Sequence, residues 1–156
     1  MRTVFWVGFW TFLADQASKY LVVHWLNLRE LSEIVAVPGL VNLRMAWNYG
    51  VNFGLFAENS ELTRWVLIAV ALVISGAVLW WTHHEEDSLP ARIAAGLLVG
   101  GALGNVVDRI LYGAVADFLN VTCCGFDNPY SFNIADIAVF AGAAGMVIFT
   151  GGKKQA

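Results

Sequence analysis

Gly100-Gly101-Ala102-Leu103-Gly104-Asn105-Val106-Val107-Asp108-Arg109 opens the part of the sequence on which the predicted fold depends. Two further runs complete it, Val115-Ala116-Asp117-Phe118 and Phe132-Asn133-Ile134-Ala135-Asp136. An apolar helix here ends in polar residues, a polar passage follows, and a second apolar helix opens with a carboxylate. Ionisable groups in segments apolar enough to enter a bilayer are costly, so they indicate a functional site.

The composition of the whole chain is that of a membrane protein. The 156 residues are 58% hydrophobic and 13% charged, and the mean hydropathy is +0.63. Soluble domains carry roughly 25% charged residues. The net charge of −3 gives no electrostatic footprint for nucleic acid.

We predict an all-α integral membrane protein whose residues 1–156 form a single domain. Four segments approach the roughly 20 apolar residues that a spanning helix needs; they lie at about 4–24, 63–82, 91–111 and 131–150. Four spans place both termini on one side of the membrane and the first and third loops on the other. Four Lys and Arg residues fall on each side, so the positive-inside rule leaves the orientation open.

The first and third loops favour a small extramembrane β-sheet. Val35 and Val37 precede Pro38-Gly39, and alternating apolar and polar positions follow from Leu40 to Trp47, which indicates a hairpin. A further strand is expected from Val115 to Thr122. Pairing these edges in one sheet would keep them from aggregating.

The predicted topology brings the ionisable side chains toward one leaflet. Asp15 and Lys19 lie in the second half of the first span, Asp108 ends the third, and Asp136 opens the fourth. His83 and His84 fall on the opposite face and His24 stands alone, so a histidine-based triad or metal site is not expected. No serine has a base partner, and metal-type spacing is absent from the sequence. Carboxylate chemistry therefore remains.

Asp117 and Asp136 form the better catalytic pair. Two carboxylates at about 3 Å cannot both ionise, so one acts as a base toward water while the other acts as an acid toward a carbonyl. Such a pair hydrolyses peptide bonds without a metal or a cofactor, and we expect neither here.

Structural roles explain several of the other polar residues. Asp15 and Lys19 stand four apart, which fits an internal salt bridge, and Asp108 is expected to pair with another helix or cap backbone groups. Arg109 complements the helix dipole and could serve only as an interface anchor. The adjacent Cys123 and Cys124 are not expected to bridge each other, and they receive no role.

At these residues the sequence resembles the lipoprotein signal peptidases, the type II signal peptidases of bacteria. The resemblance covers nearly the whole chain in five motifs. They are the three runs quoted above, Asp15-Gln16-Ala17-Ser18-Lys19, and Asn48-Tyr49-Gly50-Val51-Asn52-Phe53-Gly54. Asn52 stands where this family would place a small residue.

The resemblance implies an aspartyl endopeptidase of the bacterial inner membrane, with cytoplasmic termini and an active site toward the periplasm. Its substrates would be prolipoproteins carrying diacylglyceryl, cut just before the lipidated cysteine. Membrane lipid would be its other partner, and we expect a monomer.

The family roles carry over residue by residue. Asp117 and Asp136 match the catalytic positions, and Asn48, Asn105 and Arg109 match residues that hold the substrate. The residues that match the supporting shell are Asp15, Lys19, Gly50, Asp108, Asn133 and Ala135.

Three alternatives come from other classes of protein. A small proton-coupled transporter could use the same carboxylates, although it would want an acid at the membrane midplane. A four-span thiol oxidoreductase would need a reactive cysteine pair. A structural or assembly subunit is also possible, but it would not need a costly cluster of polar residues.

Overall fold

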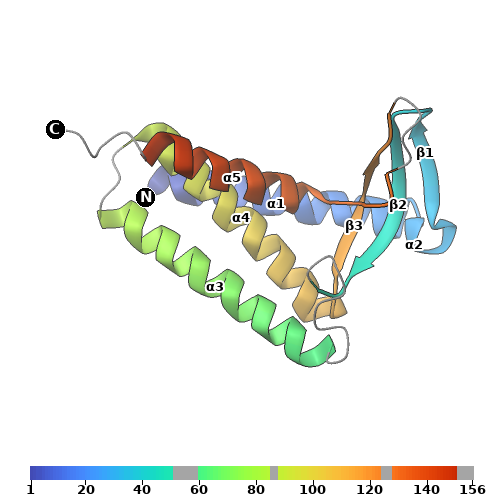
Figure 1. Ribbon diagram of the computed structural model, residues 1–156, viewed down its shortest axis with the longest axis horizontal. Helices are drawn as coiled ribbons and strands as arrows, with labels where there is room; N and C mark the ends of the chain where they lie inside the picture. Colours follow the sequence, from blue (N-terminus) through green and yellow to red (C-terminus); the bar gives the residue numbers. More distant parts are fainter. Residues whose placement is uncertain (51–59, 85–87, 124–127, 151–156) are drawn as a thin grey trace.

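The computed structural model describes residues 1–50, 60–84, 88–123 and 128–150. The chain forms four long helices, one short helix and three strands within these ranges (Figure 1). The helices are α1 (Arg2–Lys19), which continues as the π-helix η1 (Tyr20–Trp25), α2 (Leu28–Leu31), α3 (Ser60–His84), α4 (Leu89–Tyr112) and α5 (Ile134–Thr150). The strands are β1 (Glu33–Val37), β2 (Val41–Asn48) and β3 (Val115–Val121).

Helix α4 is the centre of the bundle, with α1 and α5 packed closely along it and α3 diverging (Figure 1). Small residues allow the close approach, as the glycines of the third predicted span suggested. A Cβ atom at Gly100 would overlap the carbonyl oxygen of Gly8 on α1. Helix α4 and α1 therefore touch through their backbones at this level.

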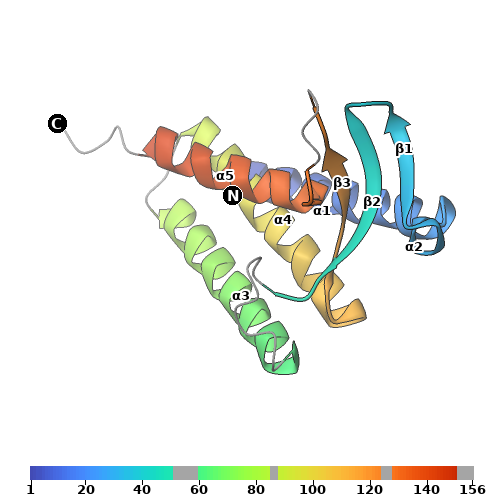
Figure 2. The same ribbon diagram turned by 45° about the vertical axis from the view of Figure 1, so that its right-hand side comes forward.

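The strands form one antiparallel sheet in the order β1-β2-β3. The hairpin turn contains Gly39 at a φ of 74°, a left-handed conformation that glycine adopts without strain. Strand β3 pairs with β2 in a register that sets Asp117 opposite Ala46. The predicted sheet from the first and third loops is confirmed, and Figure 2 shows it at one end of the helices.

Within the described ranges, two helices are long and apolar enough to cross a membrane, Glu61–His84 and Leu89–Tyr112. They match the predicted spans at 63–82 and 91–111. Helix α5 is a shorter apolar helix that begins at Ile134 rather than 131, and α1 carries Asp15 and Lys19 inside its length. Spans at 4–24 and 131–150 stay predictions.

The outer faces of these helices are apolar. Val73 on α3 is 71% exposed, and Phe140 and Val147 on α5 are 77% and 75% exposed. Such a concentration of exposed large apolar side chains suits contact with lipid rather than with water.

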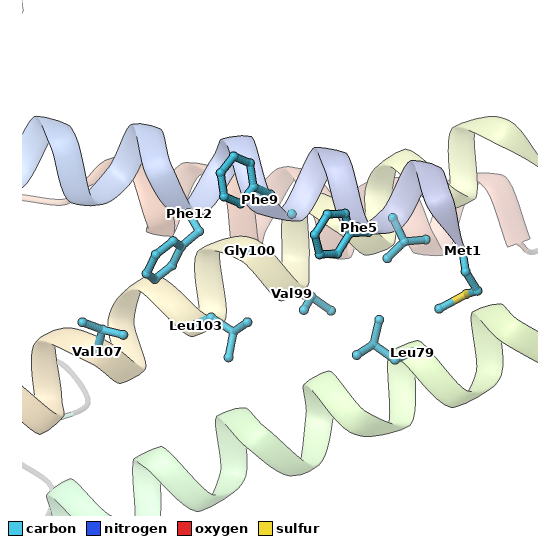
Figure 3. A pocket seen from close by; sticks show the side chains of 11 residues that line it. Met1, Phe5, Phe9, Phe12, Leu79, Val99, Gly100, Leu103 and Val107 are labelled. Carbon is cyan, nitrogen blue, oxygen red and sulfur yellow. The ribbon is translucent and has the colours of Figure 1, made fainter.

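An apolar cavity of about 590 Å³ lies between α1 and α4 and reaches Leu79 of α3 (Figure 3). Phe5, Phe9 and Phe12 line it from α1, and Leu103 and Val107 line it from α4. Met1 also lines the cavity, and because α1 begins away from the sheet (Figure 1), the cavity extends toward the end opposite the sheet.

Candidate active site

Four aspartates from four different elements meet where the sheet joins the helices. Asp15 comes from α1, Asp108 from α4, Asp117 from β3 and Asp136 from the first turn of α5. The first three side chains are buried, whereas Asp136 is partly exposed. The sequence prediction that these carboxylates lie at one end of the molecule agrees with this arrangement.

Asn133 connects the two carboxylates predicted to be catalytic. Its side-chain Nδ2 donates to Asp117 Oδ1 at 2.6 Å, and its backbone N–H donates to Asp136 Oδ2 at 3.2 Å. Its Oδ1 in turn accepts the backbone N–H of Asp136 at 2.8 Å. This reciprocal pair is a capping box, in which residues three apart satisfy each other's backbone at a helix start. The cap of α5 thus places Asp136 beside Asp117.

Two further asparagines donate directly to the carboxylates. Asn48, the last residue of β2, donates from Nδ2 to Asp117 Oδ2 at 3.1 Å. Asn105 donates from Nδ2 to Asp136 Oδ1 at 2.9 Å. The Gly50 backbone N–H donates to Asn48 Oδ1 at 3.2 Å, which orients the Asn48 amide. Both asparagines, matched by the resemblance to substrate-holding residues, here contact the carboxylates themselves.

Arg109, in the last turn of α4, adds a positive charge to the same place. It interacts electrostatically with Asp136, Asp117 and Asp108, and its Nη1 donates to the Asn105 carbonyl at 3.3 Å. Its buried Nε has no hydrogen-bond partner among the described residues. A buried donor without a partner is uncommon, so this Nε is a feature of the site that an explanation of Arg109 has to account for.

The environment of Asp117 favours its protonated form. Burial first, and then the neighbouring charge of Asp136, raise the pKa of this carboxyl to about 7, although hydrogen bonds from Asn48 and Asn133 and the charge of Lys19 act in the opposite direction. Asp117 is only 3% exposed. Asp117 can therefore keep a proton near neutral pH beside a second carboxyl, an arrangement in which one carboxyl can act as an acid.

Lys19 forms a buried ion cluster next to this pair. Its Nζ lies 2.7 Å from Asp15 Oδ2 and 2.8 Å from Asp108 Oδ2. The predicted salt bridge of Asp15 with Lys19 is therefore confirmed. Asp108 also fits its prediction, because it pairs with another helix and accepts the backbone N–H of Ala116 at 3.1 Å.

Ala135 and Gln16 complete the surroundings of this cluster. The Ala135 backbone N–H donates to Asp15 Oδ1 at 2.9 Å. Gln16 received no role from the sequence, yet its Nε2 donates to both Asp15 and Asp108. The sequence feature that could have indicated this role is an uncharged amide inside an otherwise apolar span, between Asp15 and Lys19.

Two other sequence observations have separate outcomes. Cys123 is disulfide-bonded, which the expectation of unbridged cysteines did not foresee, and its partner lies outside the described residues. Asn52 also lies outside them. Within the described ranges, His, Cys, Asp and Glu form no group of three or more that could hold a metal ion.

The comparisons with known proteins agree with this geometry. Residues 7–151 match the family model for signal peptidase (SPase) II. Proteins named "Lipoprotein signal peptidase" from Methylobacterium sp. (strain 4-46) and Azoarcus sp. (strain BH72) are 39% and 40% identical to this chain; the matches cover 90% and 85% of it, and 83% and 73% of the relatives.

Two solved structures share the fold. Both are described as a bacterial membrane enzyme structure determined by the in meso method, at 1.9 and 2.3 Å resolution. The first has a TM-score of 0.81 at 25% identity and the second 0.78 at 23%; the matches cover 99% and 100% of this chain, and 96% and 94% of those chains. The chain belongs to the signal peptidase II family.

Proposed function

We propose that this protein removes the signal peptide from prolipoproteins whose cysteine carries diacylglyceryl, and that it cuts just before that cysteine. Cleavage of lipoprotein signal peptides is the activity named for its relatives. The observation that carries the catalytic part of the proposal is the pair Asp117 and Asp136, which Asn133 bridges beneath the sheet. The transporter alternative finds no support in the family match.

In the proposed reaction Asp117 is the acid and Asp136 is the base. Asp136 is the more accessible carboxyl, and its negative charge contributes to the raised pKa of Asp117. Asp136 takes a proton from a water molecule, and that water attacks the scissile carbonyl carbon. Asp117 donates its proton toward the carbonyl oxygen, and a proton then passes to the departing amine as the C–N bond breaks. The pair therefore acts as an aspartyl peptidase centre.

Arg109 is the proposed contact for the substrate backbone. Its Nε is a buried donor beside both carboxyls and has no partner in the described part of the chain, so a peptide carbonyl would satisfy it. Asn48 and Asn105 already donate to the carboxyls. We propose that their amide groups also border the bound peptide and hold it in the orientation the reaction requires.

The setting that we propose is the bacterial inner membrane, with all four long helices crossing it and residues 1–156 acting as one domain. α1 with η1 provides a continuous helical stretch from Arg2 to Trp25, and 17 residues of α5 rise about 25 Å, close to the roughly 30 Å hydrocarbon core. The termini would then be cytoplasmic and the sheet periplasmic. Two acyl chains would hold the substrate cysteine at the depth of the carboxyl pair, and a monomer suffices for this chemistry.

Cleavage of a diacylglyceryl-modified prolipoprotein in detergent tests the proposal. Wild type is compared with Asp117→Asn and Asp136→Asn, each checked for folding by thermal unfolding, and with the exposed-site control Arg44→Ala. We expect wild type and control to cut, and both Asn variants to fold and lose at least about 10²-fold in rate. Intact lipidated substrate with wild type would overturn the function, and an active Asn variant would overturn the assignment of the pair.

A further inference from the structure

We propose that Gln16 and Lys19 join Asp15 and Asp108 into a clamp that fixes the separation of Asp117 and Asp136, and that Gln16 is thereby a positioning residue. This inference rests on the proposed peptidase function. It starts from a symmetry in the hydrogen bonds: each of the two clamp carboxylates holds the backbone one residue before a catalytic aspartate.

The first arm of the clamp runs from α1 to α5. Asp15 Oδ1 accepts the backbone N–H of Ala135 at 2.9 Å, and Ala135 directly precedes Asp136. Asp15 and Ala135 are both fully buried, so water does not compete for this hydrogen bond. Because the N–H groups of a first helical turn have no partner inside the helix, the carboxylate also satisfies a free donor of α5.

The second arm runs from α4 to β3. Asp108 Oδ2 accepts the backbone N–H of Ala116 at 3.1 Å, and Ala116 directly precedes Asp117. Both residues are buried, at 1% and 2% exposure. The hydrogen bond ties the start of β3 to the end of the helix that leads into it, and it leaves the Asp117 carboxyl free to face Asn48 and Asn133.

Lys19 and Gln16 join the two arms. Lys19 Nζ lies within 2.8 Å of an oxygen of each clamp carboxylate. Gln16 Nε2 donates to Asp15 Oδ2 and to Asp108 Oδ1, both at 3.1 Å, and approaches the Gly104 carbonyl at 3.3 Å. A cation and an amide thus hold two like charges together, which would otherwise repel each other.

The contact between α4 and α1 at Gly104, beside the clamp, leaves no space for a larger side chain. A Cβ atom on Gly104 would come within 2.5 Å of Asp15 Oδ2, so even a methyl group at this position must displace the carboxylate. The distance between the catalytic carboxyls then depends on α1, although α1 contributes neither of them. A displacement of about 1 Å in such a centre is enough to lower a rate by about 10²-fold.

Two substitutions disturb the clamp without touching the catalytic carboxyls. Gln16→Met keeps the length of the side chain and removes its amide, and Gly104→Ala pushes Asp15 while keeping every polar group. Ser18→Ala is the matched control, because the Ser18 hydroxyl donates to the Asp15 backbone carbonyl on the same helix. For each variant we measure kcat, KM and the pH profile on diacylglyceryl-modified prolipoprotein, at a temperature well below its own unfolding midpoint.

A positioning role predicts that kcat falls about 10- to 100-fold in Gln16→Met and Gly104→Ala while KM changes less than about twofold. The two apparent pKa values of the pH profile should also move closer together, because their separation reflects the interaction between the carboxyls. Ser18→Ala should match wild type. If both variants keep the kcat and the pH profile of wild type, or lose only thermal stability, the clamp is wrong. An inactive wild type would instead overturn the proposed function, and this inference with it.

Discussion

The interface between α1 and α4 has two halves that are built differently. In the half away from the sheet, Gly8 and Gly100 bring the backbones into contact, and apolar side chains border a cavity (Figure 3). In the half next to the sheet, the same helices meet through Lys19, Asp15 and Asp108. Contact between small residues is set by shape alone, whereas buried ions also require partners of opposite charge at fixed distances. The ionic half is therefore the one that can define a catalytic geometry.

The largest expected effect comes from breaking the ionic half. Lys19→Met would leave two buried carboxylates without their shared cation, which costs about 3–5 kcal/mol of unfolding free energy. We expect thermal unfolding in detergent to occur at a much lower temperature, or the variant not to accumulate. Arg29→Met removes an exposed cation and serves as the control. A Lys19→Met protein as stable as this control would show that the half next to the sheet does not depend on its buried ion cluster.

Arg109→Ala tests whether the polar end of this interface binds substrate, in addition to stabilising the fold. A hydrogen bond from a charged donor is worth about 1.5–3 kcal/mol, so we expect kcat/KM on lipidated prolipoprotein to fall about 10- to 100-fold with little change in thermal stability. Arg44→Ala, on the exposed side of β2, should leave kcat/KM unchanged. Unchanged turnover in Arg109→Ala would reduce Arg109 to a helix anchor.

Gly100→Ala tests the apolar half. The added methyl group would overlap the backbone of Gly8, and overpacking of this kind costs about 1–3 kcal/mol. Gly76→Ala is the matched control: it lies inside α3 with open space around it, and it should stabilise that helix by about 0.5–1 kcal/mol. Equal unfolding temperatures for both variants would show that α1 and α4 can move apart at Gly100 without loss of stability.

The smallest effect is a shift in pH dependence. Below about pH 7 Asp117 holds its proton, so activity that needs this acid should decline as the pH rises through 7. The amide of Asn48 stabilises the ionised form and lowers the pKa of Asp117; Asn48→Ala should therefore move the alkaline limb to higher pH.

A hydrogen bond contributes about 1.5–3 kcal/mol when its acceptor is charged and about 0.5–1.5 kcal/mol when it is neutral. The difference of about 1–1.5 kcal/mol corresponds to a shift of about one pH unit. The pH profile of kcat measures it, with Ser18→Ala as the control. A shift to lower pH would contradict the role given to Asn48.

The same linkage applies to stability. Because the pKa of Asp117 is raised by folding, its contribution to stability is fully present at pH values below about 4 and is lost as the pH rises through 7.

Much of the fold follows from local patterns. The apolar runs place the helices, and Pro38-Gly39 between two alternating segments places the hairpin. The spacing of Asp15 and Lys19 by four residues is enough to predict their salt bridge, because such residues share a helix face. Helix α5 begins three residues after the expected start at 131, because Asn133 caps it through reciprocal hydrogen bonds with Asp136.

The sequence by itself determined the membrane character, the positions of the helices and hairpin, and the set of carboxylates gathered at one end. Periodicity and composition act over short distances, and these properties depend on nothing more. Only the tertiary structure decided which donor each carboxylate receives, that Gln16 links Asp15 to Asp108, and that the residues before Asp117 and Asp136 are held by those two side chains. These contacts join residues up to 120 positions apart, and their geometry is set by how closely small residues let α1, α4 and α5 approach, which no local pattern encodes.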